Sequence, residues 1–284
     1  MVSRRARRGL GLHSLTVKGT AAERFVELAV EAGFAGVEFR LDDIAAYTEA
    51  GGRLPILARQ VKDAGLTVIR IAFPVGWQGS EGHDRQVRFD GIRQTLDAAI
   101  ELEALTIGSP IATRNLDPRR ASADLQEVAT LAAAVNIPLS MEFLGFAERW
   151  RDIRSAWALV QEAGQDNVHL LLDTFHLYRG ESDLQDLQVV PASRIALVHV
   201  NDAPARPPRE LQDTDRVLPG HGGLPLRTML EAIHAHGYRG WYSLEVMGPS
   251  VWDRDPLQVV REGAATLQSA LKGILDTLDR PEAS

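Results

Sequence analysis

The chain has 284 residues, a length that fits either one large domain or two small ones. It carries 31 Lys and Arg against 38 Asp and Glu, a formal charge of −7, so it lacks the basic field that binding to a nucleic-acid backbone uses, and we expect no nucleic-acid partner. Because it has no Cys, disulfides and thiolate metal sites are excluded, and His, Asp and Glu are left as side-chain ligands for a metal.

The N-terminal residues 1–8 include four arginines, and the segment that follows them is too short and too polar for the apolar region of a signal peptide. We interpret residues 1–8 as a basic tail and take a cytoplasmic location as the default expectation. No apolar run approaches the roughly 20 residues that a membrane span requires, so we expect no membrane partner.

Along the chain, short runs rich in Val, Ile and Leu alternate with longer segments whose apolar residues recur at helical spacing. The predicted strands are Leu10–Leu15, Gly36–Arg40, Thr67–Phe73, Leu105–Gly108, Pro138–Phe143, Val168–Asp173, Ile195–Val200 and Trp241–Val246. The predicted helices include Ala21–Ala32, Leu54–Ala64, Arg85–Leu102, Ala121–Ala134, Ile153–Ala163, Leu226–Ala235 and Pro256–Leu278. This alternation is typical of a parallel sheet with helical crossovers.

Eight strand and helix units in a chain of this length predict an α/β fold, a single (β/α)8 TIM barrel over residues 9–280. The sequence has no P-loop, and no Gly-x-Gly-x-x-Gly motif follows a predicted strand. Nothing in it therefore indicates a nucleotide cofactor. The interval 201–223, between the seventh strand and its helix, is irregular and contains four prolines. Loops of this length in a compact domain usually have a function, and this one would lie where a barrel has its active site.

Polar residues end four consecutive predicted strands, the fifth to the eighth, and these residues are Glu142, Asp173, His199 and Glu245. Because neighbouring strands lie about 4.8 Å apart, the four side chains would converge on one point. Three carboxylates that close would repel one another unless a cation lay between them. A single carboxylate at a strand end is often only a helix N-cap, but four matched positions favour one divalent metal ion, Mn²⁺, Mg²⁺, Co²⁺ or Zn²⁺.

These residues lie in segments that resemble the xylose-isomerase-like barrel superfamily, in particular its sugar phosphate isomerase/epimerase branch. The segments are Met141–Phe143, Leu172–His176, Val198–Asp202, Asp215–Gly222 and Leu244–Glu245. Within that branch the chain looks most similar to inosose isomerases and ketose 3-epimerases. Members of the family are often dimers or tetramers, so the resemblance allows a homo-oligomer.

The resemblance also implies roles for individual residues. The metal ligands of the family carry over onto Glu142, Asp173, His199 and Glu245. Its substrate-binding residues carry over onto His176, three residues after the ligand Asp, onto Arg216, and onto Glu148, which has the spacing of a substrate contact in ketose 3-epimerases. His176 could instead be a core residue packed beneath Tyr178.

Together these features predict a divalent-metal-dependent isomerase or epimerase whose substrate is a small carbohydrate or polyol, a keto sugar or a keto-inositol. The cation would stabilise an enediolate, while Glu142 and Glu245, on opposite sides of the substrate, remove and return a proton. His176 and Arg216 would bind the oxygen on which negative charge develops. Further polar or aromatic residues near strand ends could line the pocket, namely His13, Glu38, Arg40, Arg70 and Trp77. Alternatively, Glu38 and Arg40 could form an inward-facing salt bridge.

Three other functions compete with this one. Dehydratases of 3-dehydroshikimate or inosose share the barrel and the ligand set, and their reaction also begins with removal of a proton beside a carbonyl. Elimination from a 3-keto-glycoside begins with the same step and stays open for the same reason. Apurinic/apyrimidinic endonucleases are also similar, but they need three zinc ions, and Val217 stands where they have a His. A non-catalytic sugar-binding barrel would not need both candidate acid/base residues.

Overall fold

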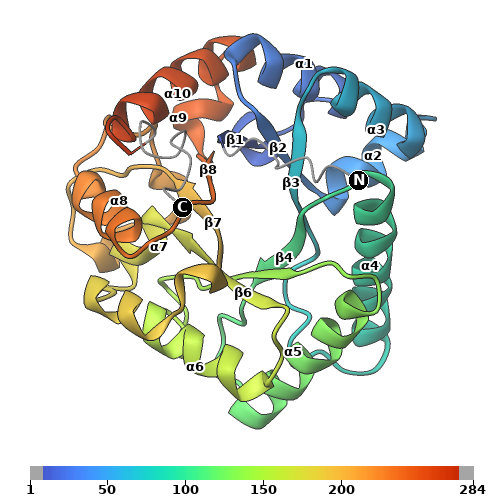
Figure 1. The fold of residues 1–284 in the computed structure, drawn as a ribbon, viewed down its shortest axis with the longest axis vertical. Coiled ribbons are helices and arrows are strands. Elements are labelled where there is room, and N and C mark those ends of the chain that lie inside the picture. Colours follow the sequence, from blue (N-terminus) through green and yellow to red (C-terminus); the bar gives the residue numbers. More distant parts are fainter. Residues whose placement is uncertain (1–8, 275–284) are drawn as a thin grey trace, which may run out of the picture.

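The structure is a computed structural model that describes residues 9–274. The predicted basic tail 1–8 and residues 275–280 of the predicted domain lie outside the described residues. Eight parallel strands pair in chain order, and the last pairs with the first, so that the sheet closes into a barrel with helices around it (Figure 1). The predicted single (β/α)8 barrel is confirmed.

The strands begin and end close to where the sequence predicts them. They are β1 Leu10–His13, β2 Gly36–Arg40, β3 Thr67–Ala72, β4 Thr106–Pro110, β5 Leu139–Glu142, β6 Val168–Asp173, β7 Ile195–Val200 and β8 Trp241–Leu244. The first strand is shorter than predicted because Ser14–Val17 forms a 3-10 helix, and the Nδ1 atom of His13 caps it by accepting a hydrogen bond from the Leu15 amide at 3.0 Å. This turn brings the chain over the end of the barrel.

The helices follow the strands along the chain, and most of them lie on the outside of the barrel (Figure 1). They are α1 Ala22–Ala32, α2 Leu41–Glu49, α3 Leu54–Asp63, α4 Gly82–Glu101, α5 Pro118–Ala133, α6 Ile153–Ala163, α7 Thr174–Arg179, α8 Leu226–Ala235, α9 Pro249–Trp252 and α10 Pro256–Ala270. Three of these helices, α2, α7 and α9, are not among those predicted from the sequence. The last predicted helix was too long, since α10 ends at Ala270 and Gly273 follows with a φ of 88°, a conformation that favours glycine.

The inside of the barrel contains an apolar layer formed by Ile69, Leu171, Leu197 and Trp241. These side chains come from four strands and meet across the barrel. Gly11 and Gly36 leave room for them, because a Cβ atom at either position would lie within 2.6 Å of the Ile69 side chain. The layer closes the interior, and polar side chains occupy the space between it and the carboxyl ends of the strands.

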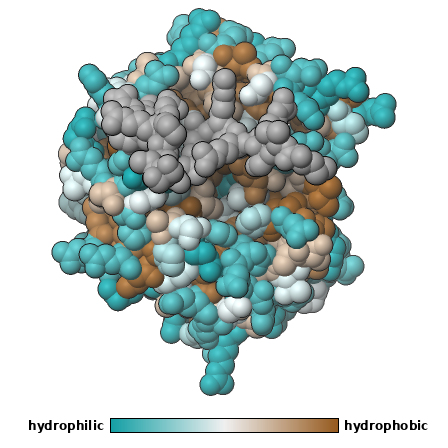
Figure 2. All heavy atoms as spheres, viewed as in Figure 1, coloured by the Kyte–Doolittle hydropathy of each residue, from teal (hydrophilic) through white to brown (hydrophobic). Residues whose placement is uncertain are grey.

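The larger apolar core lies between the strands and the ring of helices and contains residues from nearly every element. Hydrophilic side chains are spread over the face of the molecule in Figure 2, with smaller hydrophobic areas between them. Among residues 9–274, no helix combines the length and the hydrophobicity needed to cross a membrane.

Candidate metal centre

The four predicted ligands come together at one end of the barrel. Glu142, Asp173 and His199 lie at or near the ends of β5, β6 and β7, and Glu245 directly follows β8. Each is at most 5% exposed, and one ligand atom from each lies within 4.8 Å of the others. Within residues 9–274 this is the one cluster of three or more such side chains that could hold a metal ion. The parallel register of the barrel therefore produces the predicted convergence.

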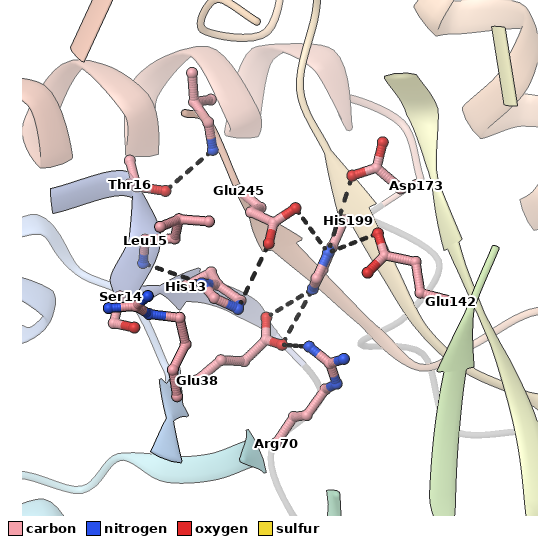
Figure 3. Close-up of polar contacts among 12 residues, drawn as sticks. His13, Ser14, Leu15, Thr16, Glu38, Arg70, Glu142, Asp173, His199 and Glu245 are labelled. Atoms are coloured by element: carbon pink, nitrogen blue, oxygen red, sulfur yellow. Dashed lines mark hydrogen bonds and ion pairs between the residues drawn. The ribbon is translucent and has the colours of Figure 1, made fainter. Parts of the chain in front are cut away.

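The ring of His199 lies at the centre of the cluster (Figure 3). Its Nδ1 atom is 3.2 Å from Glu245 Oε2 and 3.9 Å from a carboxylate oxygen of both Glu142 and Asp173. Nδ1 and the Oε1 atom of Glu142 are buried and have no hydrogen-bond partner. Buried polar atoms without partners are costly. Oxygen and imidazole donors left in this way fit the divalent metal ion that the sequence predicts.

Two further side chains fix the ligands Asp173 and Glu245. The Nη1 atom of Arg216 donates hydrogen bonds to Asp173 Oδ2 at 3.0 Å and to Glu245 Oε2 at 2.8 Å. The Nδ2 atom of Asn201 donates to the same Asp173 oxygen at 2.9 Å and to the Glu245 carbonyl at 3.2 Å. The ends of β6 and β8, which lie on either side of β7, are thus tied together, and this sets the positions of both carboxylates.

The ionisable groups of the cluster differ in pKa. Burial, together with repulsion from Glu245, raises the pKa of Glu142 to about 8. Burial also acts to raise the pKa of Glu245, but attraction to its cationic neighbours, His199 first, outweighs burial and leaves the pKa well below its usual value. Burial acts to lower the pKa of His199, but Glu38 and Glu245 outweigh it and raise the pKa well above its usual value. Glu142 and His199 therefore hold protons that a bound cation must displace.

His176 and Arg216 lie next to each other beside the cluster. The Nη2 atom of Arg216 is 2.9 Å from His176 Nε2, and the Gly145 amide donates to His176 Nδ1 at 3.2 Å. His176 is 1% exposed, yet it lines the cavity above the cluster, so it is not simply a core residue beneath Tyr178. Burial and the adjacent Arg216 charge lower the pKa of His176 well below its usual value, which keeps the ring neutral.

The irregular interval 201–223 supplies Arg216, and Asp202 organises it. The two carboxylate oxygens of Asp202 accept hydrogen bonds from the amides of four residues, Ala203, Gly220, Gly222 and Leu224. Asp202 also forms an antiparallel bridge with Val217, next to Arg216. The interval therefore lies at the carboxyl end of the barrel, beside the cluster, which is the position that the sequence predicts.

A cavity of about 450 Å³ opens above the cluster and is lined by Glu142, Glu245, His176 and Arg216. Of the further predicted lining residues, His13, Arg40 and Arg70 border it. Glu38 and Trp77 do not: Glu38 is fully buried beside His199, and Trp77 is buried against Phe73.

The alternative prediction, a salt bridge between Glu38 and Arg40, is wrong. Arg40 donates to Asp43 at 2.8 Å, because Asp43 lies one turn into the helix that begins directly after Arg40. Glu38 instead contacts His199 and Arg70.

The structure does not bring Glu148 to the cluster. It is exposed on the connection between β5 and α6 and borders a separate cavity of about 290 Å³, together with Phe146 and Arg151. A match at a single spacing fixes neither the path of a connecting loop nor the direction of its side chains. The predicted contact between Glu148 and a substrate is not supported by this placement.

Three polar residues at the site, Asn201, Asp202 and Asp213, were not predicted from the sequence. Asn201 and Asp202 directly follow the predicted strand Ile195–Val200, so their polarity after an apolar run was an available signal. Asp213 gave no such signal, because it lies in the irregular interval. It accepts a hydrogen bond from Arg216 at 3.0 Å and borders the cavity.

A family model described as xylose isomerase-like TIM barrel matches residues 26–270, nearly the whole described chain. The chain belongs to this family. It is 30% identical over 143 residues to an inosose isomerase of Halalkalibacterium halodurans, a match that covers 50% of the chain and 51% of that protein. It is 26% identical over 269 residues to an L-ribulose 3-epimerase of Mesorhizobium japonicum, covering 87% of the chain and 84% of the relative.

A third relative carries out a different reaction. The chain is 29% identical over 238 residues to a 3-dehydroshikimate dehydratase of Pseudomonas aeruginosa, a match that covers 82% of the chain but only 37% of that larger protein. Among solved structures, the crystal structure of the IOLI protein with a bound zinc atom has a TM-score of 0.86 over 93% of the chain and 98% of that protein, at 19% identity. At this identity the likeness shows a shared fold. The three curated relatives are all enzymes. The chain spans about half the length of the inosose isomerase that it matches.

Proposed function

We propose that this protein is a divalent-metal-dependent isomerase or epimerase of a small keto sugar or keto-inositol. The observation that carries the proposal is the convergence of Glu142, Asp173, His199 and Glu245 within 4.8 Å at the base of a cavity. The relatives that act as inosose isomerase and L-ribulose 3-epimerase support the same substrate class. A cavity of about 450 Å³ has room for a monosaccharide or a cyclitol.

A metal ion held by these four residues would supply Lewis-acid stabilisation of the charge that develops on substrate oxygens. The donor set suits Mn²⁺, Mg²⁺, Co²⁺ and Zn²⁺ alike, so the proposed metal is one ion of these four. The two glutamates both border the cavity, and their pKa values are displaced in opposite directions. Such a pair suits one group that takes a proton and another that gives one.

In the proposed reaction, one glutamate carboxylate removes the proton from the carbon beside the substrate carbonyl. The C–H bond breaks and an O–H bond forms on the carboxylate. The C–H electron pair becomes a C=C bond, and the π pair of the carbonyl moves to its oxygen to give an enediolate. Return of a proton to the former carbonyl carbon gives an isomer, because the oxygen on the other carbon becomes the new carbonyl and its proton passes to the first oxygen. Return of a proton to the opposite face of the original carbon restores the carbonyl and gives an epimer. Arg216 and the neutral ring of His176 lie where they can bind the charged oxygen.

A metal-dependent dehydratase is the second candidate, because the match to 3-dehydroshikimate dehydratase extends over 82% of the chain. That reaction begins with the same proton removal, after which a β-hydroxyl leaves. Elimination from a 3-keto-glycoside would follow the same course with a different leaving group.

One experiment separates these reactions. Metal-loaded protein is incubated in D₂O with ketoses, inososes and 3-dehydroshikimate, and the products are followed by NMR with and without a chelator. The proposal expects metal-dependent deuterium incorporation into an isomeric product. A new vinylic proton from one substrate would assign the protein to the dehydratases, and a lack of exchange with every substrate would contradict both functions.

The role of Glu245 can be tested in the same assay. We expect Glu245→Gln to retain some metal, because three ligands remain, and to lose turnover by several orders of magnitude, because the amide cannot take a proton. Unchanged turnover would show that Glu245 does not act as a base.

A further inference from the structure

A pair of buried charges lies on the side of His199 that faces away from the three carboxylates (Figure 3). The Nε2 atom of His199 is 3.2 Å and 3.1 Å from the two oxygens of Glu38, and Glu38 Oε2 is 3.7 Å from Nη1 of Arg70. The three side chains are at most 2% exposed. A carboxylate and a guanidinium inside a barrel are costly unless each has a partner, so this group requires an explanation.

Several features of the barrel make room for Arg70. The pairing of β2 with β3 shifts at Val37 and Glu38, and this irregularity leaves one extra residue in β3. As a result, both Ile69 and Arg70 reach the interior, which a regular strand would not allow. Arg70 then crosses above Gly108, where a Cβ atom would lie 2.8 Å from its Nε, and donates from Nε to Ser140 at 3.1 Å.

We propose that Glu38 is a positioning residue for the metal centre, acting through His199. The inference rests on the metal site proposed above and extends it to a residue that touches neither metal nor substrate. With a cation bound in place of its second proton, the imidazole is neutral and carries one N–H. Glu38 accepts that N–H from Nε2, which leaves the lone pair on Nδ1, the atom that faces the carboxylates.

The contacts of Nδ1 support this assignment. Nδ1 has no hydrogen-bond partner and lies 3.2 to 3.9 Å from one oxygen of each carboxylate ligand. If the proton were on Nδ1 instead, the lone pair of Nε2 would face the negative charge of Glu38. A carboxylate behind a ligating imidazole also increases the basicity of the ligating nitrogen.

The surroundings hold Glu38 and the His199 ring in this arrangement. Arg70 provides the positive charge next to Glu38, and Ser140 fixes Arg70 from the neighbouring strand β5. The ring of His13 packs edge-on against the ring of His199, with centroids 5.5 Å apart and planes at 83°. With these contacts the imidazole cannot rotate freely, so its ligating atom is already directed at the metal position.

The first test measures Zn²⁺ affinity by competition with a chromophoric chelator, without any substrate. We expect Glu38→Gln, which keeps the size of the side chain, to weaken Zn²⁺ binding about 10- to 100-fold. The matched control is Asp124→Asn, which changes another buried carboxylate that contacts arginines, Arg85 and Arg120, in the helical layer. This control should bind Zn²⁺ within twofold of wild type. Equal affinity of Glu38→Gln and wild type would overturn the proposal.

The second test uses NMR to observe the His199 ring, because a general loss of stability would not change which ring nitrogen carries the proton. In ¹⁵N-histidine-labelled, Zn²⁺-loaded wild type, the His199 ring should show a metal-bound Nδ1 and a protonated Nε2 that exchanges slowly with water. In Glu38→Gln the Nε2 proton should exchange faster. A metal-bound Nε2 with the proton on Nδ1 in wild type would overturn the proposal.

A further variant covers the case in which Glu38→Gln does not fold. The double variant Glu38→Gln/Arg70→Met removes both buried charges together, which is the milder change for a buried ion pair. It should show the same loss of Zn²⁺ affinity, and wild-type affinity in this variant would overturn the proposal. If the wild-type protein bound no Zn²⁺, the metal site would be wrong and this inference with it, whereas failure of Glu38→Gln alone leaves the metal site intact.

Discussion

Replacing Asp202 by Asn should destabilise the protein markedly, although the two side chains have the same shape. Oδ1 of Asp202 accepts hydrogen bonds from Ala203 and Leu224 at 2.8 and 3.0 Å, and Oδ2 accepts from Gly220 and Gly222 at 3.0 and 3.1 Å. An Asn has one oxygen, so two of these four bonds can persist. Its NH₂ group would face two backbone N–H groups, which are also donors.

The magnitude follows from the two lost bonds. Hydrogen bonds to a charged group are each worth about 1.5–3 kcal/mol, and the residue is 2% exposed, so water does not replace them easily. Allowing for relaxation of the turn, we expect Asp202→Asn to cost about 3 kcal/mol, which corresponds to a fall of about 6 °C in the midpoint of thermal unfolding for a domain of this size.

The assay is thermal unfolding followed by circular dichroism, with the surface variant Asp255→Asn as the control. Asp255 caps α10 with one bond to the Gln258 amide, and Asn caps helices as well as Asp does, so the control should change stability by less than about 0.5 kcal/mol. Proteolysis within 201–223 should also be faster in Asp202→Asn, since the turn that fixes Arg216 is loosened. If the two variants had the same unfolding midpoint, the account of the turn would be refuted.

Two other predictions concern the cluster and the barrel interior. Zn²⁺ affinity should rise by about tenfold or more for each pH unit between pH 6 and 8, because the pKa of Glu142 is raised to about 8 and that of His199 well above its usual value, and each proton must leave before the metal binds. Isothermal titration at several pH values measures this, and a constant affinity would contradict it. Gly108→Ala should lower the free energy of unfolding by about 3 kcal/mol, since the new Cβ would lie 2.0 Å from the Ser140 carbonyl oxygen. A thermal midpoint equal to that of wild type would show that β4 yields to the added methyl group.

The strand ends explain why the metal cluster was predictable. In a closed parallel barrel the carboxyl ends of all strands meet at one end, so a polar residue that ends an apolar run has a known place before any contact is known. Glu142, Asp173, His199 and Glu245 were each found in this way, and the structure brings them together. The fold itself followed from the alternation of strand and helix periods, which is a local property of the chain.

Residues outside the strand ends were harder to place. Glu148 matched a family spacing, but the loop that carries it turns the side chain towards another cavity. The pairing of Glu38 could not be read from β2 alone, because its partners come from β3 and β7. The expected pairing of Glu38 with Arg40 was based on the alternation of residues within one strand. The helix that begins at Leu41 was not predicted, and it provides Asp43 as the partner of Arg40.

The sequence by itself thus determined the class of fold, the order of its strands and the four donors of the candidate metal centre, because periodicity and strand termination are properties of neighbouring residues. Only the tertiary structure decided which atom of each donor faces the others and which groups lie behind them. The irregularity between β2 and β3, the space above Gly108 and the turn around Asp202 set these orientations. Each depends on segments far apart in the chain, whose contacts no local pattern records.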